Sequence, residues 1–111
     1  MRWPISSPRG ALATRVAELR ITVSAAGDLD SIFDHGASQW GIERAAAYVA
    51  SFDTSFALLA RFPEIGTARP EIAIGIRSTP HGSHLVYFSS DAEQVVIERV
   101  LHKRRVPRGH M

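Results

Sequence analysis

The sequence predicts a two-layer α+β domain, in which a helical hairpin packs on one face of a small antiparallel sheet in the order β-α-α-β-β-β. A long central run has apolar residues at spacings of three and four, which is typical of a helix. The last third holds runs of β-forming residues joined by short polar segments, which indicates an antiparallel meander. The length of 111 residues suits one domain. We expect it at 16–105, between a disordered extension or cloning remnant at 1–15 and a flexible basic tail at 106–111.

The first elements are a strand and an amphipathic helix. Apolar and polar residues alternate loosely over 16–23, which favours a strand. Ser24 stands where a helix N-cap is expected, and Asp28 follows where a carboxylate suits the positive end of the helix dipole. One apolar face then predicts a helix over 25–40, ended by Gly41; its residues are Leu29, Ile32, Phe33, Gly36, Ala37 and Trp40.

The second helix has the most regular pattern in the chain. Its apolar seam has separations of 3, 4, 3, 4 and 3, formed by Ile42, Ala45, Val49, Phe52, Phe56 and Leu59. A coiled-coil dimer would use such a seam, but a preceding amphipathic helix favours an antiparallel hairpin within the chain. The small residues Ala45, Ala46 and Ala50 would let the two helices approach closely. Pro63 ends the helix, and a loop follows at 65–70.

Three strands are expected in the last third. Ile72, Ile74 and Ile76 alternate with small or polar residues, which predicts a strand at 72–76. The segment 78–82 contains a Pro and a Gly and is expected to be a turn. Strands at 84–88 and 95–102 follow, separated by a polar turn at 89–93.

Composition excludes several function classes. The chain has no Cys, which rules out disulfides, thiolate metal sites and cysteine nucleophiles and is compatible with a reducing cytoplasm. The net charge of +2 is too small to indicate specific nucleic-acid binding, and no apolar run is long enough for a membrane span. Five basic residues and no acid follow position 98, namely Arg99, Lys103, Arg104, Arg105 and Arg108. They suit an anionic partner, or equally a solvated terminus.

The polar residues within the strands are the candidate site. A metal-free ribonuclease needs a base, an acid and cations around the phosphate. Arg77, Tyr87, Arg99 and His102 supply these groups if they converge on one face of the sheet. No cofactor motif is present, and His35 and His81 have no partner at metal-ligand spacing, so we expect neither a cofactor nor a metal.

The same residues also have purely structural interpretations. Arg77 can pair with Glu71 or Glu98 across the sheet. Tyr87 can be a core aromatic residue whose hydroxyl reaches the edge. His84 and His102 can be ordinary histidines at the ends of strands.

A run of short blocks from about Leu19 to Arg104 resembles the ParE toxins of the RelE/ParE superfamily in order and spacing. The run as a whole is specific, and its blocks include Gln39-Trp40-Gly41, Phe62-Pro63, Arg69-Pro70-Glu71, Gly75-Ile76-Arg77-Ser78, His84-Leu85-Val86-Tyr87-Phe88 and Arg99-Val100-Leu101-His102-Lys103-Arg104. The resemblance implies the same β-α-α-β-β-β fold. It also implies the toxin of a type II toxin–antitoxin module, held inactive by a ParD-like, ribbon-helix-helix antitoxin.

ParE toxins are associated with poisoning DNA gyrase, whereas RelE relatives cleave messenger RNA on the ribosome. RelE enzymes carry several basic residues on the second helix, where this chain has only Arg44 and Arg61, and no tyrosine follows His102. We therefore expect a gyrase-binding toxin, with a RelE-type endonuclease or an inert binding module as alternatives. The groove between hairpin and sheet is the expected platform for the antitoxin. The residues expected to bind target or antitoxin are Arg77, His84, Tyr87, Arg99, His102, Lys103 and Arg104.

Overall fold

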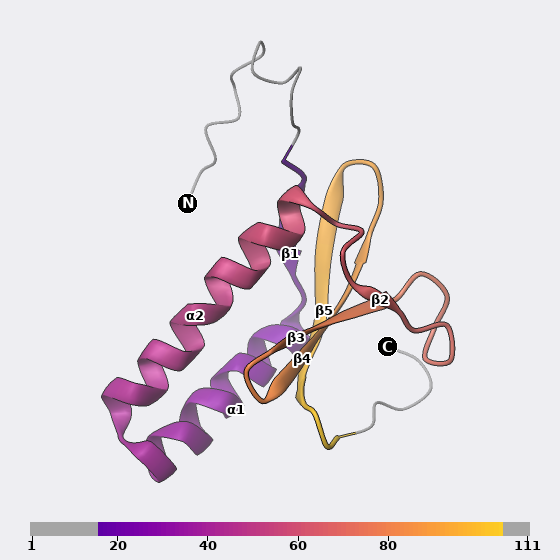
Figure 1. Cartoon of the computed structure of the whole chain (residues 1–111). Coiled ribbons are helices and arrows are strands. Elements are labelled where there is room, and N and C mark those ends of the chain that lie inside the picture. The colour runs from indigo at the N-terminus through magenta and orange to yellow at the C-terminus, as the bar shows by residue number, and fades with distance from the viewer. Residues whose placement is uncertain (1–15, 106–111) are drawn as a thin grey trace.

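A computed structural model describes residues 16–105, and the expectations for 1–15 and 106–111 lie outside these residues. The described chain has two helices on one face of a five-stranded sheet, which confirms the two-layer α+β class (Figure 1). Neither helix in this part of the chain is long and apolar enough to span a membrane.

The two helices form an antiparallel hairpin. Helix α1 spans Val23–Trp40 and α2 spans Ile42–Arg61, with Gly41 between them at a φ of 98°, which an L side chain rarely adopts. Most of the α2 seam packs inside the chain, as expected for the hairpin, through the buried residues Ala45, Phe52, Phe56 and Leu59, whereas Ile42 at its start is 67% exposed. The α1 N-cap is Thr22 and not Ser24, because the Thr22 side chain accepts a hydrogen bond from the backbone of Ala25.

The sheet has the strand order β1-β5-β4-β3-β2. Its strands are β1 (Glu18–Ile21), β2 (Thr67–Ala68), β3 (Arg77–His81), β4 (His84–Ser90) and β5 (Gln94–His102). All neighbours are antiparallel except β1, which runs parallel to β5, so the expectation of a purely antiparallel sheet was wrong in this pair. The helical hairpin takes the chain from β1, at one edge of the sheet, to β2 at the other edge. Strands β3, β4 and β5 then return across the sheet, so that β5 lies beside β1 and runs in the same direction.

The strand expected at 72–76 is wrong. This segment is a series of turns, with hydrogen bonds from Ile72 N to Arg69 O and from Ile76 N to Ala73 O. Ile72 and Ile76 are buried, but Ile74 is 96% exposed, and Gly75 has a φ of 87°. Alternate isoleucines therefore do not share a strand face here.

The turn expected at 78–82 is also wrong, because β3 extends through Pro80 to His81 and only Gly82 and Ser83 form the turn. Pro80 is tolerated since β2 pairs only with Arg77 and Ser78, which leaves this part of β3 at the sheet edge. The short strand β2 also falls inside the loop expected at 65–70.

The sheet buries residues on both faces. The larger core lies under the helices and contains Phe52, Phe56, Leu59, Val86, Phe88, Val95, Ile97 and Val100. A smaller core lies on the opposite face and contains Ile72, Ile76, Tyr87 and Leu101, with the turn segment 69–76 contributing its two isoleucines. Side chains that alternate along β4 and β5 therefore belong to different cores.

Candidate functional site

A groove of about 430 Å³ opens between α1 and the C-terminal end of β5. We call it the α1–β5 groove. It is lined by Asp28, Ser31, Ile32, His35 and Trp40 of α1, Ser83 and His84 at the start of β4, and Val100, Leu101, His102 and Arg105 at the end of the sheet. Its lining combines apolar residues with three histidines and an arginine, a composition suited to a partner with apolar and acidic groups.

Arg99 is held by α1 beside this groove. Its Nε and Nη2 donate to the two carboxylate oxygens of Asp28, each at 2.8 Å, and the backbone N of Val100 donates to the same carboxylate at 2.8 Å. The Asp28 side chain is only 11% exposed and that of Arg99 30%. Hydrogen bonding to Asp28 raises the pKa of Arg99. The pair is a bidentate clamp between α1 and β5.

Tyr87 is a core residue, 3% exposed, in the small core on the far face. It pairs with Arg99 across β4 and β5 and with Ser78 across β3 and β4. Burial raises the pKa of its hydroxyl, an effect that nearby Arg69 opposes and Glu71 reinforces.

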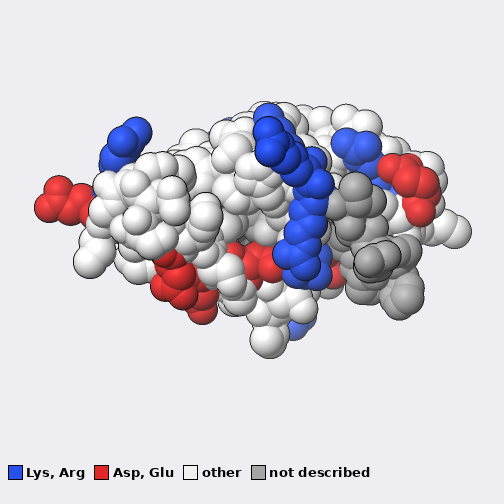
Figure 2. All heavy atoms as spheres, turned by 90° about the horizontal axis from the view of Figure 1, so that it is seen from below, with Lys and Arg blue, Asp and Glu red and all other residues white. Residues whose placement is uncertain are grey.

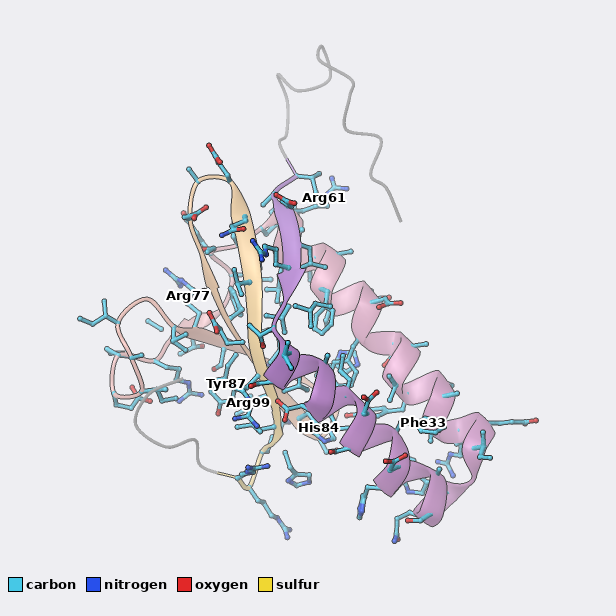
Figure 3. All side chains as sticks on the ribbon, turned by 180° about the vertical axis from the view of Figure 1, so that it is seen from behind. Phe33, Arg61, Arg77, His84, Tyr87 and Arg99 are labelled. Carbon is cyan, nitrogen blue, oxygen red and sulfur yellow. The ribbon has the colours of Figure 1, made fainter. Side chains whose placement is uncertain are left out.

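Arg77 lies apart from Tyr87 and Arg99, toward the outer edge of the sheet (Figure 3). Its Nη1 donates to the backbone oxygens of Gly66 at 2.9 Å and Glu64 at 3.4 Å. Arg77 does not form the alternative pairing with Glu71 or Glu98: Glu71 lies 3.7 Å from Arg69, and the Glu98 carboxylate accepts from Ser89.

His84 is fixed by α2. Its Nδ1 lies 2.8 Å from the Tyr48 hydroxyl, which also accepts from Ser83 N and approaches His81 O, each at 3.2 Å. Burial lowers the pKa of His84, and the nearby His102, His81 and His35 lower it further. The ring therefore favours its neutral form.

The end of β5 carries the remaining candidates. His102 is exposed, its ring centroid lies 5.4 Å from that of His84, and its Nδ1 accepts from Arg104 N at 3.1 Å. The Lys103 backbone N donates to Ser83 O, which ties the end of β5 to the β3–β4 turn. The side chains of Lys103, Arg104 and Arg105 are exposed. Figure 2 shows basic side chains aligned across this end of the molecule.

Comparison with known proteins identifies the family. The profile of the ParE toxin of the type II toxin–antitoxin system parDE matches residues 19–107. The chain belongs to the ParE toxin family. It is 32% identical to Toxin ParE1 of Caulobacter vibrioides over 92 residues, covering 83% of this chain and 95% of the relative. It is 31% identical to Toxin ParE1 of Mycobacterium tuberculosis over 85 residues, covering 76% and 87%.

Solved structures agree. The chromosomal ParDE toxin–antitoxin system from P. aeruginosa superposes with a TM-score of 0.69 at 26% identity, over 78% of this chain and 96% of that chain. The RelBE2 toxin–antitoxin complex from M. tuberculosis superposes with a TM-score of 0.56 at 24% identity, over 81% and 94%, and supports the fold alone.

In this ParE chain the expected residues fall into three places. His84 and His102 meet in the α1–β5 groove, with Lys103 and Arg104 beyond its rim. Arg99 is bound to Asp28, which lines the same groove, and Tyr87 lies in the opposite core. Arg77 is near the far edge, so the proposed ribonuclease set of Arg77, Tyr87, Arg99 and His102 does not form one exposed cluster.

Four participants on the ParE helices were not predicted from the sequence. Asp28 was assigned to the helix dipole, but its carboxylate holds Arg99. Tyr48 orients His84, and Ser51 and Ser55 hydrogen-bond the two ring nitrogens of His81, each at 2.7 Å. Tyr48, Ser51 and Ser55 lie three and four positions apart, so a polar stripe beside the apolar seam of α2 was the available signal.

The described part of the ParE chain has a second depression and no metal-binding cluster. The second depression, of about 530 Å³, lies between α1 and α2 and is lined by Leu29, Asp30, Phe33, Asp34, Ala46, Val49 and Ala50. It contains none of the expected site residues. Across residues 16–105, no group of three or more His, Asp or Glu side chains is arranged to hold a metal ion.

Proposed function

We propose that this ParE-family toxin arrests growth by binding DNA gyrase, and that a ParD-like, ribbon-helix-helix antitoxin neutralises it. Membership of the ParE family supports the toxin role. The P. aeruginosa neighbour is a ParDE toxin–antitoxin system, which supports an antitoxin as the partner. We expect the encounter with gyrase to occur in the cytoplasm.

The burial of Tyr87 is the observation that favours binding over RNA cleavage. The residue is 3% exposed, in the core on the far face of the sheet, so it cannot reach an RNA substrate as a general acid or base must. Arg99 donates from Nε and Nη2 to the Asp28 carboxylate, so two of its five N–H donors are engaged and its charge is paired. Both observations disfavour the nuclease set.

We propose that the antitoxin segment occupies the α1–β5 groove. Ile32 offers it an apolar contact and Trp40, which is 46% exposed, an aromatic one, while Val100 and Leu101 form the buried floor beneath them. Arg105 lines the groove, and Lys103 and Arg104 continue the basic surface beyond it. A segment with apolar anchors and acidic side chains is complementary to both parts.

Induced expression in a susceptible bacterium tests the target. Gyrase poisoning predicts a DNA-damage response and filamentation while translation continues, and purified toxin should inhibit gyrase supercoiling. Co-expression of the antitoxin encoded beside the toxin gene is the matched control and should restore growth. Early arrest of translation with cleaved messenger RNA would instead identify a RelE-type endonuclease. An absence of both effects would identify an inert binding module.

A further inference from the structure

The hydrogen bonds of His84 leave one ring nitrogen for the α1–β5 groove. Its Nδ1 is taken by the Tyr48 hydroxyl at 2.8 Å, whichever of the two atoms carries the proton. The other nitrogen, Nε2, belongs to a ring that lines the groove. Tyr48 on the far helix therefore sets the direction in which His84 can act.

The same network can accept a proton on His84 without losing a hydrogen bond. The Tyr48 oxygen already accepts from Ser83 N, and its own proton can be donated to His81 O. A protonated His84 then donates from Nδ1 to the Tyr48 oxygen, and the hydrogen bonds among His84, Tyr48, Ser83 and His81 are all kept. The doubly protonated ring would present Nε2–H as a charge-assisted donor.

His102 offers a matching donor. Because its Nδ1 accepts from Arg104 N, the neutral ring carries its proton on Nε2. The two rings are nearly perpendicular, at 78°, with centroids 5.4 Å apart. Both histidines thus keep Nδ1 for a protein partner and leave Nε2 for a ligand.

The surrounding charges favour an anion at this position. His35 on α1 and Arg105 after β5 line the groove with the two rings. Asp28 is the one acidic residue that lines it, and its carboxylate is already bound to Arg99 and to Val100 N. Two titratable residues of other elements also face His84, namely Tyr48 of α2 and His81 of β3.

We propose that the α1–β5 groove is a carboxylate-binding site, in which an Asp or Glu side chain of the antitoxin is held by the Nε2 atoms of His84 and His102. This rests on the proposed function, since it specifies how the antitoxin is recognised. Binding draws a proton onto His84, so the complex tightens in mild acid.

The sign follows from linkage. In the free toxin, burial and neighbouring histidines lower the pKa of His84, so its ring is mostly neutral at pH 7. A carboxylate in contact raises the pKa of this histidine in the complex. The complex then binds more protons than its separated components, and affinity rises as pH falls through the range in which His84 titrates.

Calorimetric titration with the antitoxin encoded beside the toxin gene tests the site. Affinity should be roughly two- to sixfold higher at pH 6 than at pH 8, because a pKa rise of half to one unit gives its full effect only below both pKa values. Comparison of two buffers with different ionisation enthalpies should show proton uptake on binding. Substituting the antitoxin Asp and Glu residues one at a time by Asn or Gln should identify one whose loss removes this pH dependence.

Variants of the toxin separate the roles. His84→Gln should remove most of the pH dependence and His102→Gln should weaken binding, whereas Asp53→Asn, at an exposed position on α2 that does not line the groove, should leave both unchanged. Because His102 is exposed, its variant tests the site even if His84→Gln lowers the melting temperature. Tight binding that is independent of pH and unchanged by both His84→Gln and His102→Gln would overturn the carboxylate site while leaving the antitoxin role intact. No binding at any pH would instead contradict the proposed antitoxin itself.

Discussion

Asp28 is a largely buried carboxylate, with a side chain that is 11% exposed. Three donors, two from Arg99 and one from Val100, converge on its carboxylate. The sequence separation between Asp28 and Arg99 is 71 residues, so no local pattern connects them. Sequence reasoning therefore identified Arg99 as a polar residue of interest but could not see that its charge is already neutralised.

Asp28→Asn should destabilise the domain by about 1–3 kcal/mol, because a partly buried guanidinium loses its counter-charge and one of its acceptors. The lower part of this range allows for the partial exposure of Arg99. Thermal unfolding measures the effect, at about 4–8 °C per kcal/mol for a domain of this size. Asp30→Asn, at an exposed position on the same helix, is the control and should unfold as the parent does. Equal melting temperatures for the two variants would contradict a structural role for the pair.

At the scale of elements, one residue joins β1, α1 and β5. Thr22 N donates to Ile97 O, and its hydroxyl donates to Glu98 O and accepts from Ala25 N. Glu98 is the extra residue of a β-bulge, since Tyr87 lies opposite Arg99 while the next residue, Phe88, lies opposite Ile97. The cap thus begins the first helix at the point where the last strand bends.

Thr22→Ala should cost about 1–2 kcal/mol, as expected for loss of an N-cap hydroxyl that also bonds a second element. Thr22→Ser keeps both hydrogen bonds and should recover most of this loss. Ser24→Ala, at the position that the sequence suggested for the cap, should change stability by less than about 0.5 kcal/mol. Urea unfolding of the three variants distinguishes the two cap assignments, and a larger loss from Ser24→Ala would refute the observed one.

Periodicity explains which elements the sequence could predict. The seam of α2 and the apolar runs of β4 and β5 extend over enough residues for one period to dominate, and these elements lie where expected. The alternation at Ile72, Ile74 and Ile76 spans only five residues, and the turns of 69–76 bury the first and last of them instead. Pro80 suggested a turn. It fits within β3 because β2 is too short to pair with it, and the sequence around Pro80 does not show this.

At the scale of the whole molecule, the sheet has a second core on the face that the helices do not cover. The segment 69–76 is fastened there by Arg69, whose backbone N donates to Ile76 O and whose Nε donates to Ser78 Oγ. The resemblance to ParE toxins predicted the helix-covered face correctly. It gave no reason to expect Tyr87 in a separate cluster, because the covering segment has no regular structure to predict.

Ile76→Ala should destabilise the domain by about 2–4 kcal/mol, because it leaves a cavity beside Tyr87 and Leu101. Ile74→Ala, two residues earlier, should change stability by less than about 0.5 kcal/mol, since that side chain is exposed. Guanidinium unfolding compares the pair directly. Similar losses from both variants would restore the strand that the isoleucine alternation suggested.

The two ends of the described chain lie at opposite ends of the fold. Ala17 is hydrogen-bonded to Ala60 at the end of α2, whereas Arg105 lines the α1–β5 groove (Figure 1). A fluorescent protein or surface tether fused after Arg105 would start at the mouth of the groove and compete with whatever enters it. The same label fused ahead of Val16 would leave the groove accessible, so the choice of fusion end decides whether a pull-down or imaging experiment reports the natural partners.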